Sequence, residues 1–336
     1  MKGRAMRFSV CIPVYNVERF IEASIESVLA QTLKDFEIVI IDDGSSDKSE
    51  IICQEYAKKY GFIKFFSQKN QGVFKTRYDL SIIAEGEYCV FLDADDTLKL
   101  NALEVLDNAI KTYKEPSCLV FGFTRVRENK IISIITEEQT QVLKTKEGIY
   151  KKLLSNSSYN SICRKCIRTD ILKKVELVDC FHIRMGEDLI HSLAVYKMID
   201  RIVMLPDVLY NYFMNSSSVT HTVNIKNFQP SYILFNYVYD FIETEEVSKD
   251  KIFDGVIQCY RERLVSDVIC ACSFNVSNKE KMKILRDLRR GSKKLFSNRK
   301  TKLTFGRKLI YVALKLKLYY AACVLARFAN RNIKTN

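Results

Sequence analysis

The sequence predicts an α/β protein in which a doubly wound parallel sheet precedes a helical C-terminal extension. Short apolar runs alternate with segments of helical periodicity through the first hundred residues, which is typical of parallel strands joined by helices. Polar motifs follow several of these runs, and from about Phe228 the pattern is mostly helical. A chain of 336 residues allows about two domains. We place them at 1–222 and 223–336.

Four apolar runs in the first hundred residues predict the strands of this sheet. They are Arg7–Ile12, Phe36–Ile41, Ile63–Phe66 and Tyr88–Leu92. The segments between them predict three helices, which cover Glu18–Ala30, a stretch from Asp47 to about Tyr60, and Val73–Ile83. In the first of these helices, apolar residues recur at helical spacing. Asp47 and Glu50 are spaced as a capping box that opens the second helix.

The pattern loosens after Thr97. Asn101–Lys114 is predicted to be a helix because its apolar residues fall on one face, and they are Leu103, Leu106 and Ile110. Two further strands are predicted at Cys118–Thr124 and Lys130–Ile135. The sequence contains only four prolines and eleven glycines, so we expect no long flexible linker.

Polar motifs stand at the C-terminal ends of three predicted strands. They are Pro13–Asn16, Asp42–Asp47 and Asp93–Asp96. In an open α/β sheet, ligands bind in the crevice beyond these strand ends. The last motif holds three carboxylates, which would repel one another unless a cation or a proton lies between them. It predicts a Mg²⁺ or Mn²⁺ site that receives a diphosphate; the alternative, for this motif alone, is a solvated acidic turn.

Positive charge is concentrated at the C-terminal end of the chain. Residues 281–336 hold 17 lysines and arginines and one acid, Asp287, a net charge of +16 that leaves −3 for residues 1–280. Such a segment suits an anionic surface, either nucleic acid or lipid headgroups. Within it, 303–329 is too charged to span a bilayer and too apolar to be a free linker.

We therefore expect 303–329 to lie in a membrane interface, with an anionic membrane surface as partner. The alternative is a helix packed on the core of the protein itself. The apolar stripe is not clean, because Lys315 and Lys317 point to nearly opposite sides of an ideal helix.

The N-terminus leads directly into a strand-like run, and no stretch of 18 apolar residues occurs. We therefore expect no signal peptide and no spanning helix, and a cytoplasmic location, peripheral to the inner face of the membrane. The eleven cysteines are then expected to be reduced. Cys163 and Cys166 form a CxxC without a suitable second pair of ligands, so we interpret them as thiols rather than zinc ligands.

Taken in order, the motifs resemble those of family-two glycosyltransferases with the GT-A fold, as found in bacterial polysaccharide synthesis. The dense part of the match covers roughly residues 7–100 and comprises Phe8–Asn16, Phe36–Ser45, Asn70–Gly72 with Arg77, and Gly86–Asp96. Beyond it, the match thins to Lys165, Gly186–Asp188, and Tyr210–Tyr212 with Ser218.

The resemblance implies transfer of a sugar, with inversion, from a nucleotide-sugar to a saccharide or lipid-linked oligosaccharide. The donor is expected to be a UDP-sugar. Residues 1–100 then form the nucleotide-binding half of the first domain, and residues 101–222 form the acceptor half.

The resemblance also assigns roles to the nucleotide-binding residues. Asp43 is expected to accept the N–H of uracil, and Tyr15, in the loop that begins at Pro13, to cover the flat face of the base. A carboxylate and an aromatic ring suit these two tasks. Arg77 is expected near carbonyl or phosphate oxygens of the nucleotide, together with Asp93.

The catalytic roles fall on other carboxylates. Asp95, supported by Asp93, matches the metal-binding residue, where a divalent cation lowers the cost of releasing the diphosphate. Asp188 matches the base that takes the proton of the acceptor hydroxyl, and the adjacent Glu187 is the alternative base. If neither is catalytic, the two acids form a charged pair at the start of a helix.

Two other protein classes share features with this sequence. Val90–Leu98 resembles the first motif of haloacid dehalogenase phosphatases, in which the first aspartate is the nucleophile. That motif normally opens its domain, whereas here about ninety residues precede it. A non-enzymatic nucleic-acid-binding protein is suggested only by the basic C-terminal segment, and no recognised nucleic-acid motif supports it. We therefore expect no nucleic-acid partner.

Overall fold

The computed structural model describes residues 6–128, 130–176, 186–214, 228–297, 299 and 302–333. The chain divides into two compact units. The first comprises Met1–Ile149, Ser161–Asp179 and Glu187–Ser218, and the second comprises Tyr150–Asn160, Cys180–Gly186 and Val219–Asn336. Ser218 and the predicted domain boundary at 222 lie outside the described residues.

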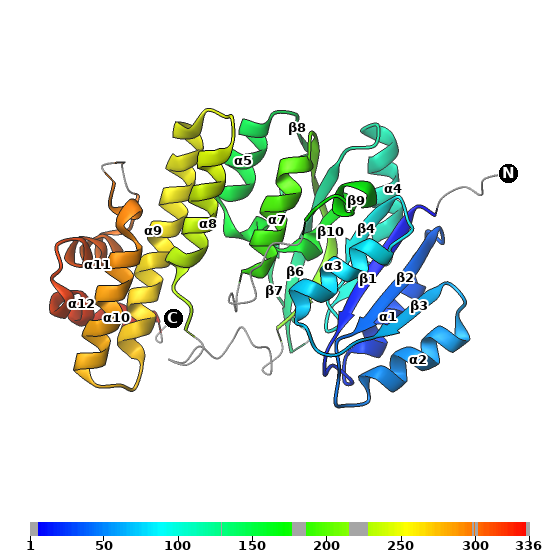
Figure 1. Cartoon of the computed structure of the whole chain (residues 1–336), viewed down its shortest axis with the longest axis horizontal. Helices are drawn as coiled ribbons and strands as arrows, with labels where there is room; N and C mark the ends of the chain where they lie inside the picture. The colour runs from blue at the N-terminus through cyan, green and yellow to red at the C-terminus, as the bar shows by residue number, and fades with distance from the viewer. Residues whose placement is uncertain are drawn as a thin grey trace. The chain divides into compact units, whose positions relative to one another are not determined.

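The first four strands lie where the sequence predicts them, and they are β1 (Phe8–Val14), β2 (Phe36–Asp42), β3 (Ile63–Ser67) and β4 (Tyr88–Phe91). They are connected by α1 (Ile21–Leu29), α2 (Ser49–Lys59) and α3 (Val73–Ile83). Every residue of β1 and β2 is buried, which explains why both sequences are mostly apolar, with Ser9 and Glu37 as buried polar exceptions that bond to each other. Figure 1 shows these elements in blue to cyan.

The strands are parallel and run in the order β3-β2-β1-β4. The chain steps outward from β1 to β3 and then returns to β4 on the other side of β1. Because such crossovers are right-handed, this return places α3 on the opposite face of the sheet from α1 and α2. The order reverses between β1 and β4, and the crevice at such a switch point is where open α/β sheets bind ligands.

Beyond β4 the sheet is mixed. β9 (Lys165–Arg168) lies between β4 and β6 (Cys118–Arg127) and is antiparallel to both. β10 (Ile202–Phe213) runs parallel to β6 and antiparallel to the short strand β5 (Thr97–Leu98). Two strands lie off the main strand order, β7 (Lys130–Ile135), which pairs with β6, and β8 (Gln141–Leu143), which pairs with β10.

The remaining helical elements up to residue 198 are short. They are α4 (Ala102–Thr112), α5 (Lys146–Leu154), η1 (Ser157–Tyr159), η2 (Ile162–Arg164), α6 (Thr169–Leu172) and α7 (Glu187–Met198). Within the first unit, the bounds of α4, β6 and β7 agree with the sequence prediction to within a few residues.

The predicted capping box at Asp47 is wrong. Helix α2 begins at Ser49 with Lys48 as its N-cap, and no side chain caps it. The Asp47 carboxylate instead accepts hydrogen bonds from the backbone N–H of Ser49 at 2.9 Å and of Glu18 at 3.0 Å. Because the helix starts later than expected, Asp47 links the turn after β2 to the loop after β1.

The second unit is helical, as the sequence predicts. Its helical elements from residue 231 onward, drawn yellow to red in Figure 1, are α8 (Ser231–Thr244), α9 (Lys249–Ser273), α10 (Asn278–Gly291), the short η3 (Lys293–Phe296), α11 (Phe305–Lys315) and α12 (Tyr319–Ile333). The buried guanidinium of Arg261 donates to the carbonyls of Leu295, Ser297 and Arg299, which fixes the segment after α10 to α9. Among the described helices, none combines the length and the apolar character needed to cross a bilayer.

Candidate active site

The loops after β1 and β2 are joined by hydrogen bonds. The side-chain oxygen of Asn16 accepts a hydrogen bond from the backbone N–H of Ser46 at 2.8 Å. The backbone N–H of Asn16 donates to the Ser45 hydroxyl at 2.9 Å. Asn16 adopts φ = 51°, a left-handed conformation that asparagine tolerates better than most residues. Tyr15 projects from this fixed loop with 52% of its surface exposed, whereas Pro13 is buried within β1. Tyr15 is therefore available to a ligand.

Asp43 is buried and holds the loop that leads into α3. Its carboxylate accepts three hydrogen bonds, from the backbone N–H of Gln71 at 2.9 Å and of Gly72 at 2.8 Å and from the Gln68 amide at 2.8 Å. An ionised carboxylate offers about four acceptor positions. One position is therefore left for a further donor, such as the N–H of a base.

Asp96 is turned into the protein. It is buried and accepts from the Tyr210 hydroxyl at 2.6 Å and from the Phe213 backbone N–H at 2.8 Å. Burial, together with the nearby charges of Asp93 and Asp95, raises the pKa of Asp96 well above its usual range. The raised pKa favours the protonated form of Asp96, and protonation would relieve part of the repulsion expected among the three acids.

Tyr210 belongs to β10, and its hydroxyl positions the acidic motif Asp93–Asp96. Besides donating to Asp96, its hydroxyl accepts from the backbone N–H of Asp93 at 3.2 Å. The neighbouring Asn211 donates to the Thr97 hydroxyl at 3.0 Å, directly after the motif. The backbone that carries Asp93 and Asp95 is therefore held to β10 on both sides.

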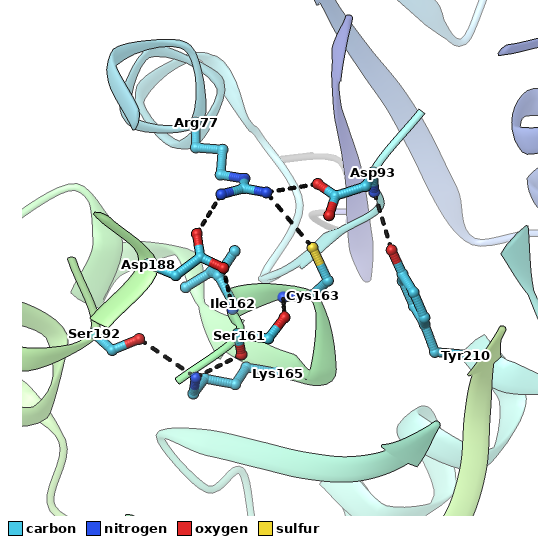
Figure 2. A network of polar contacts seen from close by, with 9 residues as sticks. All are labelled: Arg77, Asp93, Ser161, Ile162, Cys163, Lys165, Asp188, Ser192 and Tyr210. Atoms are coloured by element: carbon cyan, nitrogen blue, oxygen red, sulfur yellow. Dashed lines mark hydrogen bonds and ion pairs between the residues drawn. The ribbon is translucent and has the colours of Figure 1, made fainter. Parts of the chain in front are cut away.

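Arg77 joins two of the predicted site carboxylates. It lies on α3, is buried, and donates through Nη2 to Asp93 Oδ1 at 2.6 Å and through Nη1 to Asp188 Oδ1. Figure 2 shows the guanidinium between these two acids. Burial alone would lower the pKa of Arg77, but the charges of Asp188 and Asp93 outweigh it and raise the pKa well above its ordinary value. The guanidinium fork, expected at nucleotide oxygens, is here occupied by carboxylates.

Asp188 lies in the first turn of α7. Its second oxygen, Oδ2, accepts a long hydrogen bond of 3.4 Å from the Ile162 backbone N–H. Glu187 begins the same helix, and its side chain lies outside what the structure describes. Asp188 is therefore the member of the pair whose carboxylate can be placed in the site.

Lys165 supplies a second buried cation behind Asp188. Its ammonium donates to the Ser161 carbonyl at 2.7 Å and to the Ser192 hydroxyl at 3.3 Å (Figure 2). Burial lowers the pKa of Lys165 to about 8, although the charge of Asp188 acts in the opposite direction. Lys165 thus fixes the turn whose Ile162 contacts Asp188.

Two further buried groups complete the surroundings of Arg77. The thiol of Cys163 lies 3.9 Å from Arg77 Nη2, and His191 packs edge-on against the ring of Phe74, with 5.7 Å between centroids. Burial, with the charges of Arg77 and Lys165, lowers the pKa of His191 to about 4, so the imidazole is neutral at pH 7. Cys163 and Cys166 are both buried thiols.

The structure therefore brings together Arg77, Asp93 and Asp188, with Asp95 half-exposed on the same motif as Asp93. Within the described ranges, no three His, Cys, Asp or Glu side chains are grouped so that they could hold a metal ion. A cation here would need ligands from the substrate as well. The sequence assigned no role to Tyr210 or Lys165, although both stand in stretches that match the family pattern.

Residues 9–176, half of the chain, match the family model described as Glycosyl transferase family 2. The chain belongs to glycosyltransferase family 2. One relative is the Bacillus subtilis protein "Uncharacterized glycosyltransferase EpsJ", which is 29% identical over 215 residues. The match covers 63% of this chain and 62% of EpsJ, so it spans less than two thirds of that relative.

Solved structures share the fold. S. aureus TarS 1–349, in complex with UDP-GlcNAc, aligns with a TM-score of 0.72 and 19% identity over 97% of this chain and 92% of TarS. GalNAc-T7 with UDP, GalNAc and Mn²⁺ aligns with a TM-score of 0.52 and 18% identity, over 84% of this chain and 55% of that protein. These likenesses confirm the predicted GT-A fold of this family-2 protein. They give no support to the phosphatase or nucleic-acid-binding alternatives.

Proposed function

We propose that this family-2 protein transfers a sugar from a nucleotide-sugar to a hydroxyl of a saccharide or lipid-linked oligosaccharide, in polysaccharide biosynthesis. The observation that carries the proposal is the bridge made by Arg77 between Asp93 and Asp188 at the carboxyl end of β4. It joins the residues expected at the leaving group to the residue expected at the acceptor. A single displacement needs the leaving group and the acceptor hydroxyl at the same anomeric carbon. The proximity of the residues expected to serve them therefore supports transfer with inversion.

For the donor we propose a UDP-sugar. Tyr15 is exposed on a fixed loop and can cover a base, and Asp43 keeps one acceptor position for the uracil N–H. The TarS structure, which contains UDP-GlcNAc, supports this choice.

For the cofactor we propose Mg²⁺ or Mn²⁺, held by Asp95 and Asp93 together with the diphosphate of the donor. Cations of this kind often bind through one or two carboxylates plus substrate phosphates. The half-exposed positions of both acids fit such a site. When bound, the cation neutralises charge that develops on the leaving diphosphate. The GalNAc-T7 structure, which contains Mn²⁺, supports the proposal.

Asp188 is the base in this proposal. Arg77 holds its Oδ1, which leaves Oδ2 to take the proton of the acceptor hydroxyl. The acceptor oxygen forms its bond to the anomeric carbon as the bond from that carbon to the diphosphate breaks, and the proton passes to Asp188. The diphosphate leaves on the opposite face, so the anomeric centre is inverted.

We also propose that the enzyme works at the cytoplasmic face of a membrane, without spanning it. The strongly basic end of the chain supports this location, because the cytoplasmic leaflet carries a negative surface potential.

The proposal is tested by measuring thermal shift and donor turnover in Mn²⁺. The wild type is compared with Asp95→Ala and Asp188→Asn. The control is Asp240→Asn, on the exposed surface of the second unit. We expect UDP-sugars to raise the melting temperature by mass action in the wild type, Asp188→Asn and Asp240→Asn, but not in Asp95→Ala. Asp188→Asn is expected to lower transfer about 10²–10⁴-fold. Full transfer by Asp188→Asn, or no response to any UDP-sugar in Mn²⁺, contradicts the proposal.

A further inference from the structure

Helix α11 carries an apolar stripe on its exposed side. Four apolar residues share this side, with exposed fractions given in parentheses: Phe305 (80%), Leu309 (39%), Val312 (38%) and Leu316 (61%), the last directly after the helix. Their spacing of four, three and four residues places them within one narrow face of a helix. A surface helix normally presents polar residues on this side.

The opposite side of α11 is fixed against its own unit. Ile310, Tyr311 and Leu314 are buried, and the Tyr311 hydroxyl donates to the Leu295 carbonyl at 2.9 Å. The guanidinium of Arg261 lies 5.4 Å from the centroid of the Tyr311 ring. Because these contacts set the rotation of the helix, the stripe is held outward.

The sequence alone suggests a broken stripe, because Lys315 and Lys317 would lie on opposite sides of one continuous helix. The structure removes this conflict. Helix α11 ends at Lys315, and Lys317 lies in the following turn with φ = 63°. The apolar character continues in this turn and in α12, with Leu318, Tyr320 and Phe328 exposed by 54%, 75% and 61%.

Exposed apolar residues on this scale mark an interaction site, and the surrounding charge indicates its partner. Lys308 and Lys315, spaced by seven residues, lie along one flank of the stripe. Residues 288–336 contain fourteen lysines and arginines and no aspartate or glutamate. A second copy of the chain would bring the same positive charge against this face, whereas an anionic lipid surface is complementary to it.

We propose that α11 and the turn after it form a docking surface for an anionic membrane. The helix lies in the plane of the interface with the stripe among the acyl chains, while Lys308 and Lys315 extend to the headgroups. With 11 residues, it is about 16 Å long, which suits an in-plane helix rather than a spanning one. The proposal rests on the peripheral location proposed above, and it names the surface responsible.

The test is flotation of the full chain with vesicles of phosphatidylcholine alone or with about 30% phosphatidylglycerol, a fraction chosen to give a clear negative surface potential. We expect binding to the anionic vesicles only, weakened by salt. The double variant Phe305→Asp/Leu316→Asp is expected to bind at least about 10-fold more weakly. Leu100→Asp is the matched control, because Leu100 is also 61% exposed but lies in the first unit.

Donor turnover with a soluble acceptor, measured on the same samples, separates this proposal from the proposed transfer activity. Turnover without vesicle binding overturns the docking surface alone, and binding without turnover overturns the transferase assignment alone. Equal vesicle binding by the double variant and Leu100→Asp also overturns the surface. Two further results would assign the stripe to another partner and overturn the surface. One is a wild-type oligomer that the double variant converts to a monomer. The other is salt-dependent RNA binding without vesicle binding.

Discussion

Arg77 and Asp188 form an ion pair that joins the middle of α3 to the first turn of α7. The same guanidinium reaches Asp93 at the end of β4. Removing one partner of a buried ion pair leaves an uncompensated charge and typically costs about 3–5 kcal/mol. Arg77 thus holds both the donor side and the acceptor side of the proposed site. A substitution of Arg77 should therefore disturb both sides.

Arg77→Lys tests this bridge. A lysine provides a point charge on a flexible stem and cannot reproduce the fork that reaches both carboxylates. We expect kcat to fall about 10–100-fold, since small misplacements of reacting groups have effects of this size, with a smaller change in KM. Lys75→Gln, which removes a part-exposed pair with Asp79 and a cation–π contact with Tyr78 on the same helix, should leave both constants near wild type. A wild-type kcat in Arg77→Lys would show that the bridge is not needed for the reaction.

Tyr210→Phe tests how the acidic motif is positioned. The change removes the hydroxyl that donates to Asp96 and accepts from the Asp93 N–H, and leaves both groups short of a partner. We expect the free energy of unfolding in urea to fall by about 1–3 kcal/mol and Mn²⁺-dependent donor binding to weaken. Tyr320→Phe, at an exposed site, should change stability by less than about 0.5 kcal/mol. Equal stability of the two variants would argue against the positioning role.

Asp43→Asn separates two tasks of one carboxylate. The single carbonyl oxygen of an amide cannot serve the three donors that Asp43 now binds, so we expect a loss of about 1–3 kcal/mol in unfolding free energy. Binding of UDP, followed by calorimetry at a temperature where the variant is folded, should also be lost. Gln68→Leu removes one of the three donors but keeps the carboxylate. UDP binding should therefore survive in Gln68→Leu, and its loss there would mean that loop order, rather than the carboxylate, determines binding.

The parts of the fold that could be predicted are those with a local signal. β1 and β2 are buried along their whole length, so their sequences are mostly apolar. β9 could not be predicted in the same way, because it has four residues and includes Lys165 and Arg168. Its place between β4 and β6 depends on pairing with distant strands, which no local pattern reveals.

The same distinction holds for the candidate site. The acidic motif at the end of β4 and its likeness to family 2 are visible in the sequence. The sequence does not show which carboxylate turns inward, because Asp95 and Asp96 are adjacent and chemically alike. The choice is made by Tyr210, more than a hundred residues later, which binds Asp96. In the same way, the partners of Arg77 come from β4 and α7, so its role as a bridge required the structure.

Glu37 makes the stability of the sheet depend on pH. It is buried in β2, accepts from the Ser9 hydroxyl at 2.6 Å and the Glu85 N–H at 2.7 Å, and forms an ion pair with Lys64 at 2.8 Å. Burial alone would raise the pKa of Glu37, but the bonds with Lys64, Ser9 and Glu85 outweigh it and lower the pKa below its ordinary value of 4.5.

Because the pKa of Glu37 is lower in the folded than in the unfolded chain, its ionisation stabilises the fold above about pH 4.5. This stabilisation is lost as the pH falls through the folded value. We expect Glu37→Gln to lower the unfolding free energy at pH 7 by about 1–3 kcal/mol and to approach the wild type at pH 3. Urea unfolding at a series of pH values measures the difference, with Glu85→Gln, at a more exposed partner of Lys64, as control. A Glu37→Gln curve that stays parallel to the wild type from pH 7 to pH 3 would assign the acid sensitivity to other groups.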